Sequence, residues 1–132
     1  MVLVDTNVLL DVLNSHPVWL HWSASQMLHL GMTERLVINP IIYAEVSITF
    51  VTLAEVEESM DKMDLTLEDL PREVAFLAGK AFVQYRRNGG TRTNVLPDFF
   101  IGAHAAFLGC PLLTRDVRRY ATYFPTVQLI TP

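Results

Sequence analysis

The chain has 132 residues, of which 51% are hydrophobic and 18% charged; this composition is typical of one globular domain over residues 1–132 and excludes a disordered chain. Its formal net charge of −4 argues against general affinity for nucleic acid, because phosphate binding normally relies on Lys and Arg. The single cysteine, Cys110, excludes an internal disulfide and is expected of a cytoplasmic protein. No apolar stretch reaches the roughly 18 residues of a membrane span, so we expect no membrane association.

Short apolar runs alternate with helix-like segments along the chain. The pattern predicts strands at about 2–5, 35–39, 64–67, 110–114 and 127–130. Helices are predicted at about 7–14, 17–30, 41–50, 52–62, 71–87, 98–108 and 116–123, with Asn7 capping the first. Strands separated by helices favour a central five-stranded parallel sheet between two helical layers, an α/β fold of three layers. Ligands of such sheets lie beyond the carboxyl ends of the strands.

Four acidic residues are placed where a solvent-facing acid is not expected. Asp5 ends the first predicted strand, and Asp98 and Asp116 stand near the starts of predicted helices. These positions meet at one edge of a parallel sheet. Glu45 lies in the middle of a predicted helix on an otherwise apolar stripe. We therefore expect these four carboxylates to lie near one another.

Carboxylates that lie together repel one another and raise one another's pKa unless a cation is present. A set of oxygen ligands without His or Cys favours Mg²⁺ or Mn²⁺ over zinc. Each acid also has a plainer interpretation: Asp98 and Asp116 as helix caps, Asp5 as a turn residue, and Glu45 as half of a buried ion pair with an arginine. Together, however, the four acids favour a metal site.

Four segments of the chain resemble the PIN-domain family, and more narrowly the VapC-type toxins of bacterial toxin–antitoxin pairs. They are Val-Asp-Thr-Asn-Val-Leu-Leu at 4–10, Tyr-Ala-Glu-Val at 43–46, Leu-Pro-Asp-Phe-Phe-Ile-Gly-Ala-His-Ala at 96–105, and Leu-Leu-Thr-Arg-Asp at 112–116 followed by Tyr120. The segments occur in the family's order and spacing and cover essentially the whole chain.

The resemblance implies a metal-dependent endoribonuclease that hydrolyses RNA with an activated water and that a cognate antitoxin protein inhibits. It also implies a homodimer. The implied ligands of Mg²⁺ or Mn²⁺ are Asp5, Glu45, Asp98 and Asp116, with polar support from Asn7 and Thr114. Binding of one ion and binding of two both stay open, as does the RNA target.

Arginines gather near two of the acidic positions. Arg86, Arg87 and Arg92 flank Gly89-Gly90 shortly before Asp98, and Arg115 belongs to a second group, with Arg118 and Arg119, around Asp116. We expect the first three and Arg115 to grip RNA phosphates at the mouth of the site. The alternative for Arg86 and Arg87 is a solvated helix end that complements the helix dipole.

Two other functions compete with the nuclease. One is a PIN-fold module that binds RNA or protein without cutting it, which the four retained acids disfavour. The other is a phosphohydrolase with Asp5 as a covalent nucleophile, as in haloacid-dehalogenase-like enzymes. These enzymes need a second Asp two residues later, where this chain has Asn7.

Overall fold

Five short parallel strands form one sheet in the order β3-β2-β1-β4-β5, in a computed structural model that describes residues 1–132. The strands are β1 (Val2–Val4), β2 (Leu36–Ile38), β3 (Leu65–Leu67), β4 (Leu112–Leu113) and β5 (Leu129–Ile130). Every neighbouring pair is parallel, so the predicted five-stranded parallel sheet is confirmed. The side chains of β1, β2 and β4 are buried, as expected of strands that helices cover on both faces.

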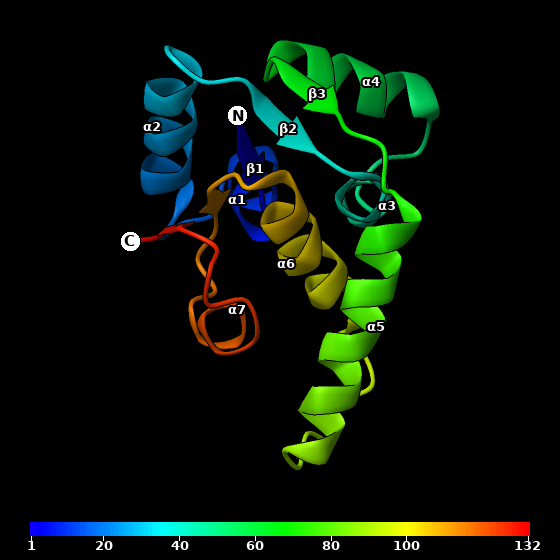
Figure 1. The fold of residues 1–132 in the computed structure, drawn as a ribbon. Coiled ribbons are helices and arrows are strands. Elements are labelled where there is room, and N and C mark those ends of the chain that lie inside the picture. Colours follow the sequence, from blue (N-terminus) through cyan, green and yellow to red (C-terminus); the bar gives the residue numbers. More distant parts are fainter.

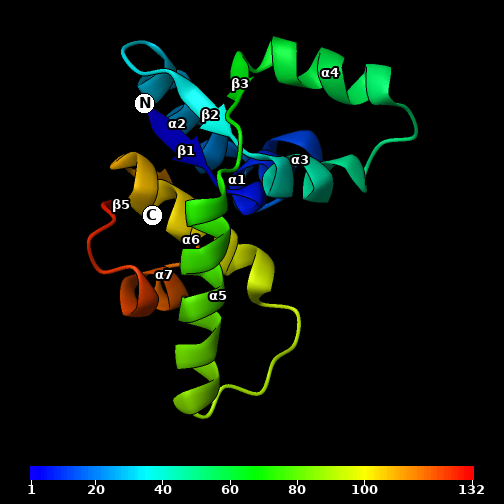
Figure 2. The same cartoon turned by 45° about the vertical axis from the view of Figure 1, so that its right-hand side comes forward.

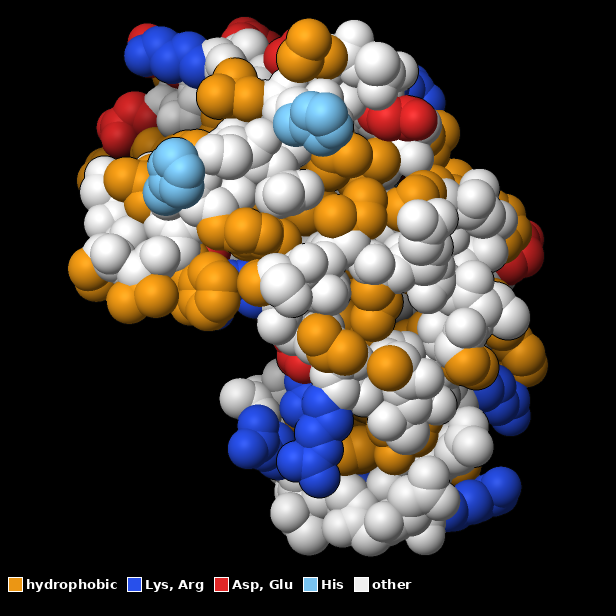
Figure 3. Space-filling view, turned by 90° about the vertical axis from the view of Figure 1, so that its left-hand side faces the viewer, with side chains coloured by type: hydrophobic (Ala, Val, Ile, Leu, Met, Phe, Trp, Pro, Cys, Tyr) orange, Lys and Arg blue, Asp and Glu red, His pale blue; other side chains and the backbone are white.

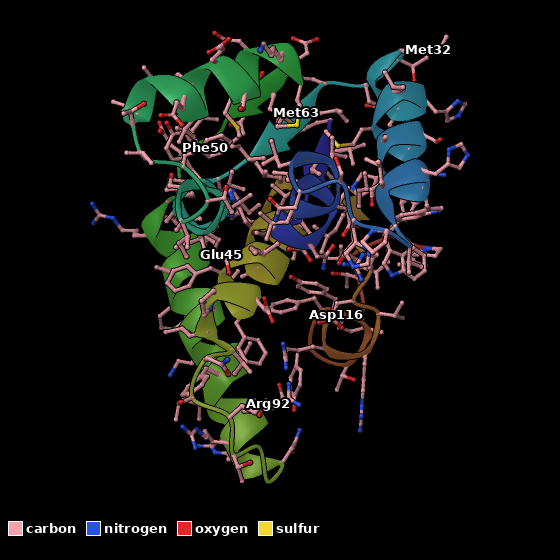
Figure 4. The ribbon with its side chains drawn as sticks, turned by 180° about the vertical axis from the view of Figure 1, so that it is seen from behind. Met32, Glu45, Phe50, Met63, Arg92 and Asp116 are labelled. Carbon is pink, nitrogen blue, oxygen red and sulfur yellow. The ribbon has the colours of Figure 1, made fainter.

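Seven helices flank the sheet. They are α1 (Thr6–Leu13), α2 (Leu20–Gly31), α3 (Pro40–Ser47), α4 (Leu53–Lys62), α5 (Arg72–Arg87), α6 (Leu96–Leu108) and α7 (Arg118–Tyr123). Figure 1 shows α6 in front of β1, and Figure 4, seen from behind, shows α1 in front of the sheet. The two helices thus cover opposite faces, which confirms the three-layer architecture. No helix of the structure has the length and apolarity needed to cross a membrane.

The observed helices begin within one to three residues of the predicted starts, and side-chain hydrogen bonds explain two of these differences. Helix α1 is capped by Asp5, whose carboxylate accepts the backbone N–H of Thr6, and not by Asn7 as the sequence suggested. Helix α2 begins only at Leu20, because the His16 ring accepts the backbone N–H groups of residues 18 and 19 and keeps that segment in a turn. The first difference matters for function, since it frees the Asn7 side chain.

The strand order places two polar residues at the switch point of the sheet. Strand β1 pairs with β2 on one side and with β4 on the other, so the chain crosses over between them. Asp5 follows β1 and Thr114 follows β4, both at the carboxyl edge where α/β sheets bind ligands.

Helices α5 and α6 complete this edge. They pack along each other, and the far half of α5 extends beyond the body of the molecule (Figures 1 and 2). The chain then returns through residues 88–95 to the start of α6. Asp98, in the first turn of α6, is thereby placed near the ends of β1 and β4.

Candidate active site

Asp5 is the buried centre of the site. Its side chain accepts hydrogen bonds at both carboxylate oxygens although the residue is only 4% exposed. Oδ1 accepts from the backbone N–H of Thr6 at 2.7 Å, and Oδ2 accepts from the hydroxyls of Thr114 at 2.6 Å and Tyr120 at 3.1 Å. These donors are neutral. They fix the carboxylate in place but bring no positive charge to it.

Asn7 and Thr114, the two polar positions expected beside the acids, both contact Asp5. The Asn7 amide donates to Asp5 Oδ2 at 3.1 Å and lies 3.3 Å from Thr114 Oγ1. Its carbonyl oxygen accepts the backbone N–H of Arg115 at 3.2 Å. Asn7 therefore ties the start of α1 to the segment after β4.

Glu45 reaches the site from α3 and is half-buried. Its Oε1 accepts the Thr6 hydroxyl at 2.7 Å, while the Thr6 backbone N–H is bound to Asp5. Thr6 consequently links the two acids. No arginine or lysine pairs with Glu45, so the structure does not contain the buried ion pair that the sequence left open as an alternative.

Asp98 and Asp116 share the side chain of Arg119, which comes from α7. The Arg119 guanidinium donates to Asp98 Oδ2, and its Nη1 lies 3.9 Å from Asp116 Oδ2. The backbone N–H of Asp116 donates to Thr114 Oγ1 at 3.0 Å. Figure 4 shows Asp116 in the segment before α7 and Glu45 on α3, the two elements that border this region.

Helix capping does not explain Asp98 or Asp116. Helix α6 follows Val95 and α7 follows Val117, and neither helix has a side-chain hydrogen bond at its cap. Asp98 instead points to Arg119 from inside the first turn. Of the three acids near helix starts, only Asp5 caps a helix.

The surroundings of the acids raise the pKa of two of them. Burial raises the pKa of Asp5 from 3.8 to about 7, with a further increase from the charge of Asp98. Burial also raises the pKa of Asp98; the Arg119 guanidinium opposes this change, while Asp116 and Glu45 add to it. Burial, more than the charges of the neighbouring acids, therefore disfavours the ionised form of both carboxyls.

The donor chemistry of these residues fits a hard divalent cation. Every candidate ligand is a carboxylate, hydroxyl or amide oxygen. No three acidic, histidine or cysteine side chains converge at metal-binding spacing; the Thr6 hydroxyl contacts Glu45, and Arg119 lies against Asp98 and Asp116. The Arg119 guanidinium supplies the cationic charge between two of them. The residues that could hold Mg²⁺ or Mn²⁺ are Asp5, Glu45, Asp98 and Asp116.

Three of the four arginines that we expect to contact RNA lie at or after the end of α5. Arg92 is exposed and lines a polar cavity together with Asp116. Arg87 is exposed in the last turn of α5, and the Arg86 guanidinium lies 5.1 Å from the centre of the Phe82 ring. Of these three arginines, only Arg92 lines a cavity together with an acidic site residue.

Sequence reasoning missed the surroundings of three side chains. Arg115, the fourth of these arginines, is bound to buried Asp11 on α1 by two hydrogen bonds. Asp11 could have been found as Glu45 was, since it is an acid within an otherwise apolar helix. Arg119 and Tyr120 contact Asp98 and Asp5. The sequence pointed to Arg119 only through its closeness to Asp116, and to Tyr120 through the motif that it completes, but it gave neither residue a partner.

Comparison with protein families gives one match. A family model described as PIN domain matches residues 2–125, a range that includes all four acids. None of the curated proteins compared with the chain matches it.

Solved structures resemble the chain over nearly its full length. A chain of VapBC2 from Rickettsia felis, bound to a DNA fragment from its promoter, is 19% identical with a TM-score of 0.76, over 99% of this chain and 98% of that one. A chain of a toxin–antitoxin complex from Klebsiella pneumoniae is 19% identical with a TM-score of 0.71, over 99% of this chain and 97% of that one. A chain of VapBC-1 from nontypeable Haemophilus influenzae is 20% identical with a TM-score of 0.70, over 99% of this chain and 98% of that one. At these identities the likeness is one of fold.

Proposed function

Because this chain belongs to the PIN-domain family, we propose that it is a Mg²⁺- or Mn²⁺-dependent endoribonuclease that acts as the toxin of a toxin–antitoxin pair. The proposed reaction is hydrolysis of RNA phosphodiester bonds by an activated water. Asp5, Glu45, Asp98 and Asp116 are the proposed metal-binding residues.

The observation that carries this proposal is the state of Asp5. A buried carboxyl beside Asp98, held only by neutral donors and with its pKa raised to about 7, is unfavourable as a carboxylate in the metal-free protein. A divalent cation removes that penalty, because it favours the ionised carboxylates. Clusters of this kind, in which burial and neighbouring charges perturb a pKa, are typical of functional sites.

The protein's own residues then have distinct tasks. Thr114 and Tyr120 hold the Asp5 carboxylate in one orientation, and Asn7 keeps the segment after β4 against α1. Thr6 positions Glu45 through its hydroxyl. Preorganised ligands of this kind reduce the rearrangement needed when charge develops on the phosphate.

A bound divalent cation would neutralise charge at the phosphate and lower the pKa of a water that it binds. Arg118, which is exposed near Asp116 and makes no ion pair, adds positive charge for the RNA backbone.

The proposal is tested by cleavage of a structured RNA and by metal calorimetry on the same preparations. We expect cleavage in Mg²⁺ or Mn²⁺ that Asp5→Asn abolishes, together with heat of metal binding that the substitution reduces. Asp61→Asn is the matched control, since Asp61 is exposed on α4, away from the site. Equal cleavage by the Asp5→Asn protein, or no metal binding at millimolar concentration, would overturn the proposal.

A PIN-fold binding module without catalysis is the second candidate. The observation that favours it is the contact of Arg119 with Asp98, since this internal cation already neutralises part of the acidic charge. The same experiments separate the two functions. RNA binding without cleavage and without metal binding would support the module.

An antitoxin partner is proposed because the structures with this fold include toxin–antitoxin complexes. An apolar cavity of about 460 Å³ between α2 and α4 offers room for a protein segment, with Met32 and Met63 in its wall (Figure 4). Leu28 and Met32 remain 75% and 82% exposed beside it.

The test expresses, together with this chain, the product of any small reading frame that adjoins its gene. It should inhibit cleavage, and Leu28→Glu should weaken the inhibition, whereas Phe76→Glu on the exposed face of α5 should leave it unchanged. Equal inhibition of both variants would contradict the proposal that the antitoxin binds at the cavity between α2 and α4. The expected homodimer is measured separately, by sedimentation equilibrium.

A further inference from the structure

A polar cavity of about 490 Å³ opens directly beside the acidic residues. Asp116 and Arg119 line this cavity, and Arg119 also contacts Asp98. A ligand in the cavity therefore lies next to the proposed metal ligands. Its other walls come from the end of α5, the segment after it, and α7. This volume falls within the roughly 300–1,000 Å³ of sites that bind small molecules or single nucleotides.

The segment after α5 is held beside this cavity by two contacts with Tyr85. A Cβ at Gly90 would lie 2.4 Å from the Tyr85 ring, so only glycine lets the backbone approach that closely. Two residues later, the backbone N–H of Arg92 donates to the Tyr85 hydroxyl at 3.1 Å. These contacts fix where Arg92 enters the cavity wall.

Two tyrosine rings form the aromatic part of the wall. Tyr85 and Tyr123 meet edge to face at 6.1 Å, and both pack against buried Phe99. The Asn88 amide donates to the Tyr123 hydroxyl at 3.4 Å. Both tyrosines are half-buried, so their positions are fixed while part of each ring stays accessible.

The cavity also contains arginines without acidic partners. Arg92 and Arg118 are exposed and make no ion pair, in contrast to Arg119, which is bound to Asp98. Figure 3 shows Lys and Arg side chains gathered on the lower part of this face, with a small acidic area directly above them. Unpaired arginines beside accessible tyrosines are the combination that binds single-stranded nucleic acid.

We propose that this cavity binds one nucleotide of single-stranded RNA next to the phosphodiester that is cut, with its phosphate on Arg92 and Arg118 and its base against Tyr85 and Tyr123. The inference rests on the proposed function for the neighbouring bond. It selects unpaired RNA, because the base must leave a helical stack to reach the tyrosines.

The test measures binding of a fluorescein-labelled single-stranded 12-mer RNA by anisotropy, in EDTA so that no divalent cation supports cleavage, at several KCl concentrations. Arg92→Gln and Arg118→Gln should each weaken binding and should lower the slope of log K against log salt by about 0.7, the value for one lost contact to a single strand. Arg72→Gln, at the exposed start of α5, is the matched control and should leave the slope unchanged.

The aromatic contribution has a different signature. Tyr123→Leu should weaken binding roughly 5- to 100-fold with an unchanged salt slope, because stacking and not charge is lost. Tyr123→Phe keeps the ring and should retain near-parent affinity, and circular dichroism checks that Tyr123→Leu is folded. A duplex of the same RNA should bind more weakly and should be insensitive to Tyr123→Leu.

Parent-like affinity and salt slope in both arginine variants would overturn the inference, and so would equal binding of duplex and single strand. If the chain cuts RNA but these variants bind normally, the inference fails and the proposed nuclease stands. If the variants behave as expected but the chain never cuts RNA in Mn²⁺, the proposed nuclease fails and only an RNA-binding cavity remains.

Discussion

The Arg115 guanidinium lies against the Asp11 carboxylate through two hydrogen bonds, from Nε at 2.7 Å and from Nη2 at 2.9 Å. Asp11 is 1% exposed and also accepts the Ser23 hydroxyl at 2.6 Å. The guanidinium lies 5.2 Å from the centre of the Trp19 ring. Because Arg115 directly precedes Asp116, this pair fastens the segment that carries an acidic site residue to α1.

We predict that Arg115→Gln lowers the free energy of unfolding by about 2–4 kcal/mol, because it leaves a buried carboxylate without its cation. Urea unfolding followed by circular dichroism measures the loss. Arg118→Gln removes an exposed arginine that makes no ion pair and should change stability by at most about 0.5 kcal/mol. Equal losses in the two variants would show that the Asp11 contact contributes little.

The sheet, and the positions of Asp5 and Thr114 at its carboxyl edge, could be predicted because their signals are local. Alternating strands and helices imply a parallel sheet, and Asp5 and Thr114 stand at the ends of strands that proved to be neighbours. The starts of α1 and α2 could not be predicted to the residue. They depend on which side chain accepts the first free N–H groups, Asp5 in one case and His16 in the other.

The long-range polar pairs could not be predicted. Arg115 and Asp11 are 104 residues apart, so the sequence offers many other partners for each. The same holds for the buried pair Asn39 and His104, 65 residues apart, in which the Asn39 amide donates to His104 Nδ1 at 3.1 Å. Such pairs connect helices whose relative positions only the folded chain determines.

The pKa of Asp5 predicts how stability changes with pH in the metal-free protein. Folded Asp5 keeps its proton up to about pH 7, whereas in the unfolded chain it ionises near 3.8. Between these values the folded state binds more protons, so each unit of rising pH costs about 1.4 kcal/mol of stability through this group. Asp5→Asn removes this dependence.

The measurement is urea unfolding of the parent and of Asp5→Asn at pH 5 and pH 7 in EDTA. Comparison with the variant is needed because burial lowers the pKa of His104, which costs stability as pH falls below 6.5 and so acts in the opposite direction. Between pH 5 and pH 7, the free energy of unfolding of Asp5→Asn should rise relative to that of the parent. Parallel pH profiles of the two proteins would contradict the raised pKa.

Arg119 competes with a divalent cation for Asp98. We expect Arg119→Gln to bind Mn²⁺ about three- to tenfold more tightly by calorimetry, because the carboxylate then lacks its internal counterion. In EDTA the same variant should be less stable to urea, since nothing offsets the repulsion among the acids. Arg118→Gln, on the same helix without a carboxylate contact, is the control. Weaker Mn²⁺ binding by Arg119→Gln would mean that this guanidinium supports the metal site.

Gly102 lets α6 lie against the residue that follows α7. A Cβ at position 102 would meet the Phe124 ring at 2.3 Å, and Phe124 is only 7% exposed, so its ring has little room to move. We predict that Gly102→Ala lowers the free energy of unfolding by about 1–3 kcal/mol through overpacking.

The matched substitution is Gly79→Ala in the middle of α5, where an added Cβ meets nothing within 4 Å. There the better helix propensity of alanine should raise stability by up to about 1 kcal/mol. Opposite signs for the two variants in thermal and urea unfolding are the expected result. Gly102 is also one helical turn from Asp98, so its variant should weaken Mn²⁺ binding, whereas Gly79→Ala should not. Stabilisation by both substitutions would show that α6 can move away from Phe124 without cost.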